Sequence, residues 1–175
     1  MARVSRISSV AYEYAQEEAR KRSWQHVEKE HLFIGILSIE KAKILFTPAR
    51  LGMDRHVSDD EAECNGIKEL FGRFDIDAAA LRRTLRGRLP RGAFHHSGDE
   101  ILSQSEECGA LNLRSAQIGR GEINSFSVFA AILEDPGELI RSLLCEFIIE
   151  PRFLLKQTLV AQTEAKKNYS PSTVY

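Results

Sequence analysis

Apolar residues near the start of the chain fall on one side of a predicted helix. From Ile7 onward they recur three or four positions apart, and charged residues fill the positions between them. The pattern predicts an amphipathic helix that ends near Arg22. The apolar positions of this helix are Ile7, Val10, Ala11, Tyr14, Ala15 and Ala19.

A nearly continuous apolar run follows, from Glu30 to Leu37 (EHLFIGIL). It is shorter than the roughly 20 residues that a membrane span needs. It is also too continuous for a helix with a solvent-facing side. We therefore expect a short buried helix over about 29–38, with Glu30 and His31 in its first turn.

Two further helices are predicted before residue 90. The segment GIKELFGRF (66–74) predicts the third helix, and Asp77 is expected to be the N-cap of the fourth. The segment 90–98 then breaks the pattern with proline and glycine and predicts a linker. The apolar positions of the fourth helix are Ala78, Leu81, Leu85 and Leu89.

The same order of elements returns after this linker. We expect a long helix over about 99–119, a short apolar helix over 125–133 and a third helix over 137–147. A fourth helix should begin at Pro151, because proline suits the first turn of a helix. The polar segment 163–175 predicts a flexible tail or linker.

Aligning the two halves indicates an internal repeat. Val27 aligns with Ile123 at an offset of 96 residues, whereas Leu70 aligns with Leu143 at an offset of 73. The difference of 23 residues places an insertion in the first copy, within about 40–63. The sequence thus predicts an all-α protein made of two related four-helix units in one compact domain. The acidic residues of the insertion are Asp59, Asp60, Glu61 and Glu63.

Composition narrows the possible classes of function. The chain has 24 basic and 25 acidic residues, so its charge balance favours neither a nucleic acid nor an anionic membrane as a partner. Cys64, Cys108 and Cys145 lack the close spacing of zinc or redox motifs. We expect reduced thiols in a cytoplasmic protein, with Cys145 in the core. Neither a secretory signal nor a membrane span is predicted.

The sequence shows no catalytic motif. It lacks the patterns GxxxxGK[ST], GxSxG and HExxH. Glu30 and His31 are neighbours, so on a helix they point about 100° apart and do not share a face for one metal ion. We therefore expect no enzyme activity, no metal and no cofactor.

Two polar clusters have simple structural interpretations. The segment FHHSGD contains His95, His96 and Asp99, and we interpret it as a solvated linker instead of a metal site. A group of arginines falls near the end of the fourth predicted helix, where cations oppose the negative end of the helix dipole. An acidic protein partner suits this group better than nucleic acid does. Its members are Arg82, Arg83, Arg86, Arg88 and Arg91.

These repeated patterns resemble the double Clp N-terminal motif, the repeat domain at the front of Clp ATPases. The first copy supplies Ala15, Ala19 and Val27, followed by KEHLFIGIL and FDIDAAALRRTL. The second copy supplies INSFSVFAAIL and FIIEPRFLL. The resemblance extends over about 5–162, with one repeat at 5–89 and the other at 99–162.

The resemblance implies a non-catalytic protein-binding module with two pseudo-twofold four-helix repeats. Such domains dock substrate or adaptor proteins for a ring-forming Clp-type AAA+ unfoldase, which acts as a chaperone or with a protease. A regulatory or sensor domain, free-standing or coupled to a different output, is the alternative.

The resemblance also implies a ligand site. Some family members bind phosphoarginine through the Glu of the EHL motif, and in this chain only Glu30 retains that residue. The alternative is that Glu30 only stabilises its own helix, because a carboxylate is favoured by the dipole at a helix N-terminus. Phe126 and Ser127 replace the Glu and His of the motif in the second copy, and His31 is expected to be structural. At the position before, Ser125 is expected to cap its helix through its hydroxyl, which a lysine cannot do.

Overall fold

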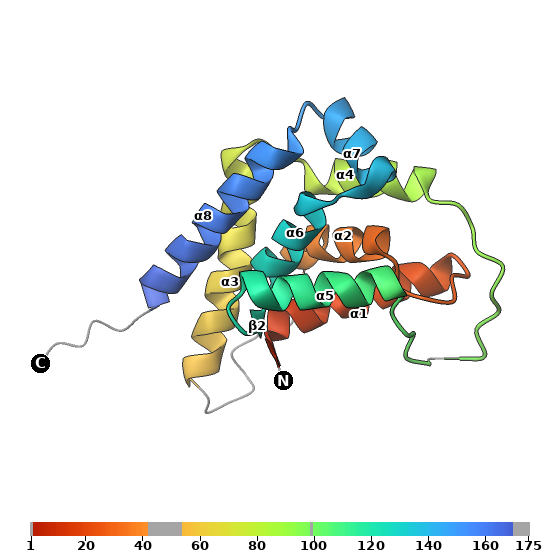
Figure 1. Cartoon of the computed structure of the whole chain (residues 1–175), viewed down its shortest axis with the longest axis horizontal. Coiled ribbons are helices and arrows are strands. Elements are labelled where there is room, and N and C mark those ends of the chain that lie inside the picture. Colours follow the sequence, from red (N-terminus) through yellow and green to blue (C-terminus); the bar gives the residue numbers. More distant parts are fainter. Residues whose placement is uncertain (1, 42–53, 99, 170–175) are drawn as a thin grey trace, which may run out of the picture.

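The computed structural model describes residues 2–41, 54–98 and 100–169 (Figure 1). Across them the fold is all-α, as predicted, with one pair of two-residue strands, β1 (Arg3–Val4) and β2 (Glu122–Ile123). No helix in this part of the chain is long and apolar enough to cross a membrane. The helices are α1 (Arg6–Lys21), α2 (Lys29–Leu37), α3 (Asp54–Arg73), α4 (Ala78–Arg88), α5 (Glu106–Ile118), α6 (Ser125–Glu134), α7 (Gly137–Glu146) and α8 (Pro151–Tyr169).

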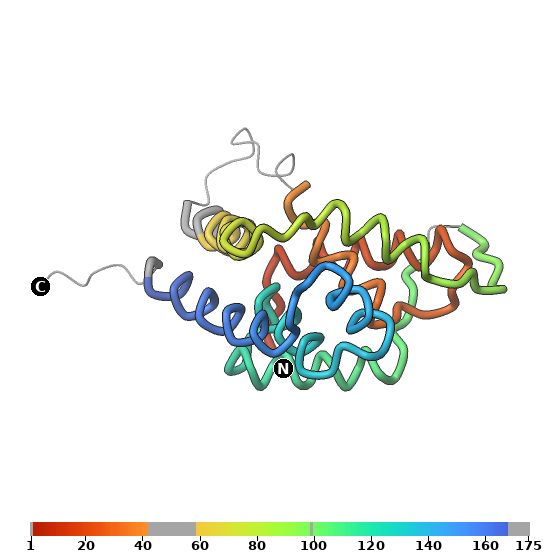
Figure 2. Tube along the Cα trace, turned by 90° about the horizontal axis from the view of Figure 1, so that it is seen from above, coloured from red at the N-terminus to blue at the C-terminus, as the bar shows by residue number. Residues whose placement is uncertain are grey.

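The apolar helices α2 and α6 form the centre of the molecule. Helices α1 and α5 cover them on one side, and α4 and α7 lie on the other side (Figure 1). The rings of Phe33 and Phe129 meet across the centre, with centroids 5.9 Å apart. Helices α3 and α8 lie side by side at one end of the molecule (Figures 1 and 2). The continuous apolar runs of α2 and α6 therefore reflect burial on every side.

Helix α1 packs closely against α2. A Cβ atom added to Gly35 of α2 would collide with the carbonyl oxygen of Ala11 of α1. Ala15 and Ala19 continue the same side of α1, and both are fully buried. The small residues of both helices allow their backbones to approach.

Short parallel pairings join the two halves of the chain. β1 pairs with β2, and Val27 forms an isolated parallel bridge with Gln104. The Ser5 N–H donates to the Ile123 carbonyl at 2.8 Å, and the Ser105 N–H donates to the Val27 carbonyl at 3.1 Å. The sequence did not predict these pairings, because segments of two residues are too short to show an alternating pattern.

Helix α5 begins later than predicted, at Glu106 instead of near residue 99. Its N-cap is Ser105, whose hydroxyl oxygen accepts a hydrogen bond from the Cys108 N–H at 3.3 Å. Residues 100–104 are not helical, and Val27 holds them through its N–H bond to the Ser103 carbonyl at 2.9 Å.

Helix α3 extends into the predicted insertion. It is 20 residues long, whereas α7, which follows α6 in the second half, has 10. About ten of the extra residues thus lengthen a helix instead of forming a loop. The predicted insertion also includes residues 42–53, which lie outside the described part of the chain.

Helix α8 continues into the segment that was predicted to be a flexible tail. Ala161 and Gln162 are buried, the Glu164 carboxylate lies 3.1 Å from the Arg73 guanidinium, and the Lys166 ammonium lies 3.4 Å from the Gly119 carbonyl. These contacts hold the helix against the rest of the fold as far as Lys166, and the helix ends at Tyr169. Residues 170–175 of the predicted tail lie outside the described residues.

Cys145 is exposed on α7, so its prediction as a core residue is wrong. The buried side of α7 consists of Ile140, Leu143 and Leu144. Cys145 comes one position after Leu144, about 100° further around the helix. All three cysteines are free thiols.

Candidate functional site

Helix α2 begins with a capping box formed by Glu28 and His31. The Glu28 N–H donates to Nδ1 of His31 at 3.0 Å, which places the proton of the neutral ring on Nε2. The ring is fully buried and meets the edge of Trp24, with centroids 5.4 Å apart. Burial lowers the pKa of His31 to about 4, so the imidazole is neutral near pH 7. These contacts give His31 a structural role.

Glu30, the predicted ligand contact, is half-buried in the first turn of α2. Burial raises the pKa of its carboxyl group, and the nearby charges of Glu107 and Glu28 raise it further. The Glu30 backbone N–H and the Lys29 ammonium act in the opposite direction. The carboxyl groups of Glu28 and Glu107 are thus close enough to act on Glu30, and this end of α2 carries more negative than positive charge.

Lys29 joins three helices at this site. Its ammonium is almost completely buried, donates to the Asp135 carbonyl at 2.7 Å and lies 3.7 Å from the Asp135 carboxylate. It also pairs with Glu107 in the first turn of α5. The positive charge of Lys29 is thus used within the fold, to hold α2 against the start of α5 and the end of α6.

The matching end of α6 has a different N-cap from the one predicted. Asn124 is the N-cap, because its Oδ1 accepts from the Ser127 N–H at 2.9 Å, and the Ser127 hydroxyl bonds to the Asn124 N–H at 2.9 Å. The prediction of Ser125 as the cap is therefore wrong. Like Lys29 in α2, Ser125 is the first residue inside the helix.

Glu63 occupies the N-terminal end of α6 and was missed as an important residue. Its carboxylate accepts from the Ser125 N–H at 2.6 Å and from the Ser5 hydroxyl at 3.0 Å. Burial raises its pKa, while these hydrogen bonds favour the charged form. Glu63 lies four and seven positions before Ile67 and Leu70, both buried. Extending that spacing backwards would have placed Glu63 on the inner side of α3.

Phe126 occupies the position in α6 that Glu30 has in α2. It is 2% exposed, and its Cζ would lie 2.7 Å from a Cβ added to Gly66 of α3. The start of α6 thus carries a packed aromatic ring in place of a half-exposed carboxylate. The two helix ends therefore differ in chemistry.

The predicted arginine group does not form one basic face. Arg82 is buried and pairs with Glu40 at 3.1 Å, and Arg86 binds Glu18 through two hydrogen bonds. The other three members, Arg83, Arg88 and Arg91, are exposed, and Arg88 pairs with Glu146. The predicted N-cap of this helix is confirmed, since Asp77 Oδ1 accepts from the Ala80 N–H at 2.8 Å.

Of the two histidines in the linker, His96 contacts its neighbours. Nδ1 of His96 lies 3.0 Å from Glu100 Oε1, and its ring packs on Phe94. His95 is exposed, and Asp99 lies outside the described residues. In the described ranges, no group of three or more His, Cys, Asp or Glu residues is arranged to hold a metal ion.

Comparison with protein-family models and with curated proteins finds no match for this chain.

Proposed function

We propose that the chain is a docking module of the Clp N-terminal type, without catalytic activity. It consists of two pseudo-twofold four-helix repeats, α1–α4 and α5–α8. In the cytoplasm it binds substrate or adaptor proteins for a Clp-type AAA+ unfoldase. The observation that carries this proposal is that unusual backbone features recur at equivalent positions in the two halves.

The left-handed residues are the clearest of these features. Ser23 (φ 60°) and Arg120 (φ 59°) follow α1 and α5, at an offset of 97 residues. Asp75 (φ 52°) and Ile148 (φ 58°) follow α3 and α7, at an offset of 73. Residues other than glycine rarely adopt positive φ, and these four are the ones that do so in the described part of the chain. One pair matches the sequence offset of 73 and the other lies one residue from the offset of 96, which supports two copies of one backbone.

The hydrogen bonds between the halves occur as two equivalent bonds, as a twofold axis requires. Ser5 binds the segment before α6 through Ile123, and Ser105 binds the segment before α2 through Val27. Exchanging α1 with α5 and α2 with α6 converts the first bond into the second. This exchange supports a pseudo-twofold relation between the repeats.

Tyr12 and Asn112 give further support. They are 100 residues apart, like the two N-cap serines, and the Tyr12 hydroxyl hydrogen-bonds to Asn112 Oδ1. Two equivalent residues touch each other only close to an axis that relates them. The predicted axis would therefore pass between α1 and α5.

Glu30 is the proposed ligand contact of the first repeat. The surplus of carboxylates around it favours a cation such as the guanidinium of phosphoarginine. Phe126 removes the equivalent carboxylate from the second repeat. The proposed ligand site is therefore present in one repeat only.

Binding of two probes to the purified chain tests this function. The probes are free phosphoarginine, followed by calorimetry, and fluorescently labelled lysozyme kept unfolded by reduction and alkylation, followed by anisotropy. We expect micromolar binding of both probes and no ATP hydrolysis. Glu30→Gln should weaken phosphoarginine binding about tenfold, because a charge-assisted contact is lost. The control Glu13→Gln, at an exposed position of α1, should bind like the unchanged chain.

Two outcomes would contradict the proposal. If neither probe binds, the docking function is wrong. If Glu30→Gln binds phosphoarginine as tightly as Glu13→Gln does, the ligand role of Glu30 is wrong. The coding sequence beyond Tyr175 tests the link to an unfoldase, since Walker motifs there support it and a different output domain supports the sensor alternative.

A further inference from the structure

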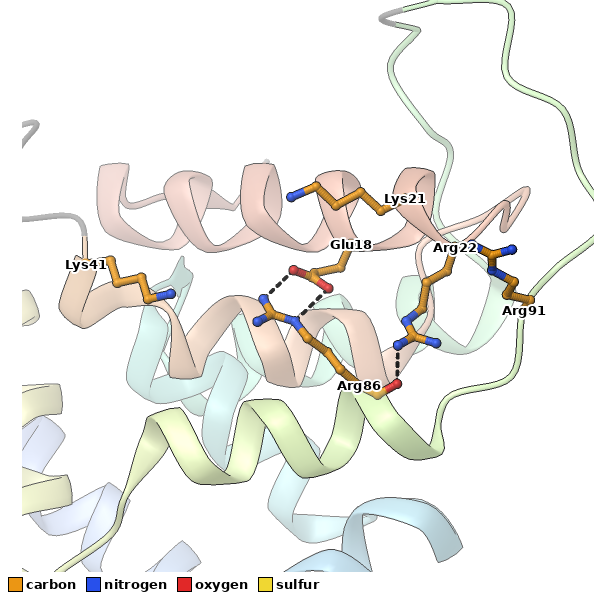
Figure 3. A pocket seen from close by; sticks show the side chains of 6 residues that line it. All are labelled: Glu18, Lys21, Arg22, Lys41, Arg86 and Arg91. Atoms are coloured by element: carbon orange, nitrogen blue, oxygen red, sulfur yellow. Dashed lines mark hydrogen bonds and ion pairs between the residues drawn. The ribbon is translucent and has the colours of Figure 1, made fainter.

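A basic hollow of about 510 Å³, whose described lining does not include Glu30, lies where α1, α4 and the residues after α2 meet. We use the name basic hollow for the space between these side chains, which Figure 3 shows. Lys41 and Arg91 lie at opposite ends of it, with the other side chains between them (Figure 3). Its lining residues are Glu18, Lys21, Arg22, Lys41, Arg86 and Arg91.

Most of the positive charge in the hollow is not neutralised. Of the six lining side chains in the described part of the chain, five are cationic, and the one carboxylate, Glu18, is bound by Arg86 through Nε at 2.9 Å and through Nη2. Lys21 pairs with Glu17 at 2.6 Å on the exposed surface, where water and salt screen the pair. Among the described residues, no acidic partner is found for Lys41 or Arg91.

The guanidinium of Arg22 is fixed in place while it keeps its charge. It donates to the carbonyl of Leu89 at 2.7 Å and to that of Arg86, near the end of α4. These acceptors are neutral, although they carry the partial negative charge of a helix C-terminus. They orient the guanidinium but leave most of its charge available to a ligand.

The backbone on the Arg91 side is also held in place. The Gly92 N–H donates to the Arg22 carbonyl at 2.8 Å, and the Phe94 N–H donates to the Ser23 carbonyl at 2.9 Å. A Cβ at Gly92 would collide with the Ser23 carbonyl, so this close approach requires glycine. The segment that carries Arg91 is thus bound to the end of α1, and a ligand does not have to order it.

We propose that the basic hollow binds an extended acidic segment, rich in Asp and Glu, of a partner protein. This inference rests on the proposed docking function, and it names the chemistry of one class of partner. The cationic side chains are spread from one end of the hollow to the other. This spacing suits an extended peptide with several carboxylates better than it suits one compact anion. Among the described residues that line the hollow, none is aromatic and could stack on a nucleic-acid base.

The test uses the full chain and a fluorescein-labelled peptide of about twelve glutamates, followed by anisotropy at low and at physiological salt. We expect binding that weakens as salt is raised. The double variant Lys41→Glu/Arg91→Glu should weaken binding about tenfold or more, because two exposed charges are reversed. Neither side chain has a partner to lose in the described fold, so the variant should keep its helical circular dichroism and melting temperature.

The matched control is Arg152→Glu/Lys156→Glu on α8, which changes the net charge equally at two exposed positions. We expect less than a twofold effect of this control on peptide binding. The inference is wrong if the peptide does not bind, or if the two double variants weaken binding equally. It is also wrong if an oligonucleotide of twelve thymidines binds more tightly than the peptide and depends on Lys41 and Arg91.

Unfolded lysozyme separates this inference from the docking function, because lysozyme is a basic protein. If lysozyme binds and the glutamate peptide does not, only the basic hollow has been misassigned. If the peptide binds through Lys41 and Arg91 while lysozyme and phosphoarginine do not bind, the acidic-segment site stands and the broader docking function fails.

Discussion

The carboxylate of Glu63 lies 2.6 Å from the backbone nitrogen of Ser125, so a side chain of α3 satisfies a free N–H in the first turn of α6. The same carboxylate accepts from the hydroxyl of Ser5, the N-cap residue of α1. One acidic group thus joins the starts of two helices from opposite halves of the chain.

Replacing Glu63 should destabilise the fold, and more so when the new side chain offers no hydrogen-bond acceptor to Ser5 and Ser125. Glu63→Ala removes the acceptor of the buried Ser125 N–H and of the half-buried Ser5 hydroxyl, so we expect a loss of about 2 kcal/mol in the free energy of unfolding. Glu63→Gln retains an acceptor oxygen and removes the cost of a buried charge, so the loss should be smaller. Urea unfolding followed by circular dichroism measures both variants.

Glu61→Ala is the matched control for Glu63, because Glu61 is an exposed acidic residue on the same helix. We expect its unfolding free energy to stay within about 0.5 kcal/mol of the unchanged chain. An equal loss in Glu61→Ala and Glu63→Ala would show that the Glu63 carboxylate does not join the helices.

The buried ring of His31 should make stability depend on pH. Its pKa falls from 6.5 in the unfolded chain to about 4 in the fold, so the unfolded state binds more protons between these values. The contribution is present above pH 6.5 and is lost as pH falls towards 4. The pKa difference corresponds to about 3 kcal/mol. Urea unfolding at a series of pH values measures this loss.

The variant His31→Gln isolates the contribution of His31, since glutamine does not titrate. Glu30 and Glu63 have raised pKa values and change stability in the opposite direction, because their burial becomes less costly when they are protonated. The difference between the unchanged chain and His31→Gln should therefore shrink as the pH falls from 6.5 to 4. If the difference in unfolding free energy between the two chains stays constant with pH, His31 has the same pKa in the folded and the unfolded state.

Gly35 should tolerate no side chain. Gly35→Ala places a methyl group against the Ala11 carbonyl and forces α1 and α2 apart, so we expect a loss of about 3 kcal/mol or more. Gly109→Ala is the control, because nothing lies within 4 Å of a Cβ at this position in α5. It should stabilise the chain by up to about 1 kcal/mol. Thermal unfolding should show a lower melting temperature for Gly35→Ala and a higher one for Gly109→Ala. These opposite shifts would confirm the close contact of α1 and α2.

Ile148 combines a positive φ with a branched side chain that is 94% exposed. Ile148→Asn should stabilise the chain by about 1 kcal/mol, because asparagine adopts this conformation at lower cost. Leu113→Asn removes another exposed apolar side chain, at 71% exposure, from a regular helix. Thermal unfolding should show a higher melting temperature for Ile148→Asn only. Equal shifts would indicate a general effect of surface polarity.

The two central helices were predicted almost to the residue, because burial on all sides produces a continuous apolar run that the sequence shows directly. The first turns of α3 and the last turns of α8 were not predicted, because their sequences are polar. The end of α8 is held by partners distant in sequence, such as Arg73 for Glu164 and Gly119 for Lys166. Local patterns contain no information about such contacts.

The candidate sites, too, could be predicted only where a local sequence motif marks them. Glu30 and His31 were identified from their place in one short motif. Glu63 was missed, because its partners Ser5 and Ser125 are 58 and 62 residues away. The basic hollow was only partly foreseen. The sequence grouped five arginines near the end of α4, and the fold uses two of them, Arg86 on α4 and Arg91 in the segment after it, with cations from other segments.

The parallel pairings between the halves have a consequence for how the chain is made. A ribosome releases β1 long before β2, and it releases Val27 long before its partner Gln104. The first four helices therefore emerge with their connecting segments unpaired and with Glu63 still lacking the Ser125 N–H. We expect the native state to form late in synthesis, in one cooperative step that awaits the arrival of α6, instead of one half at a time.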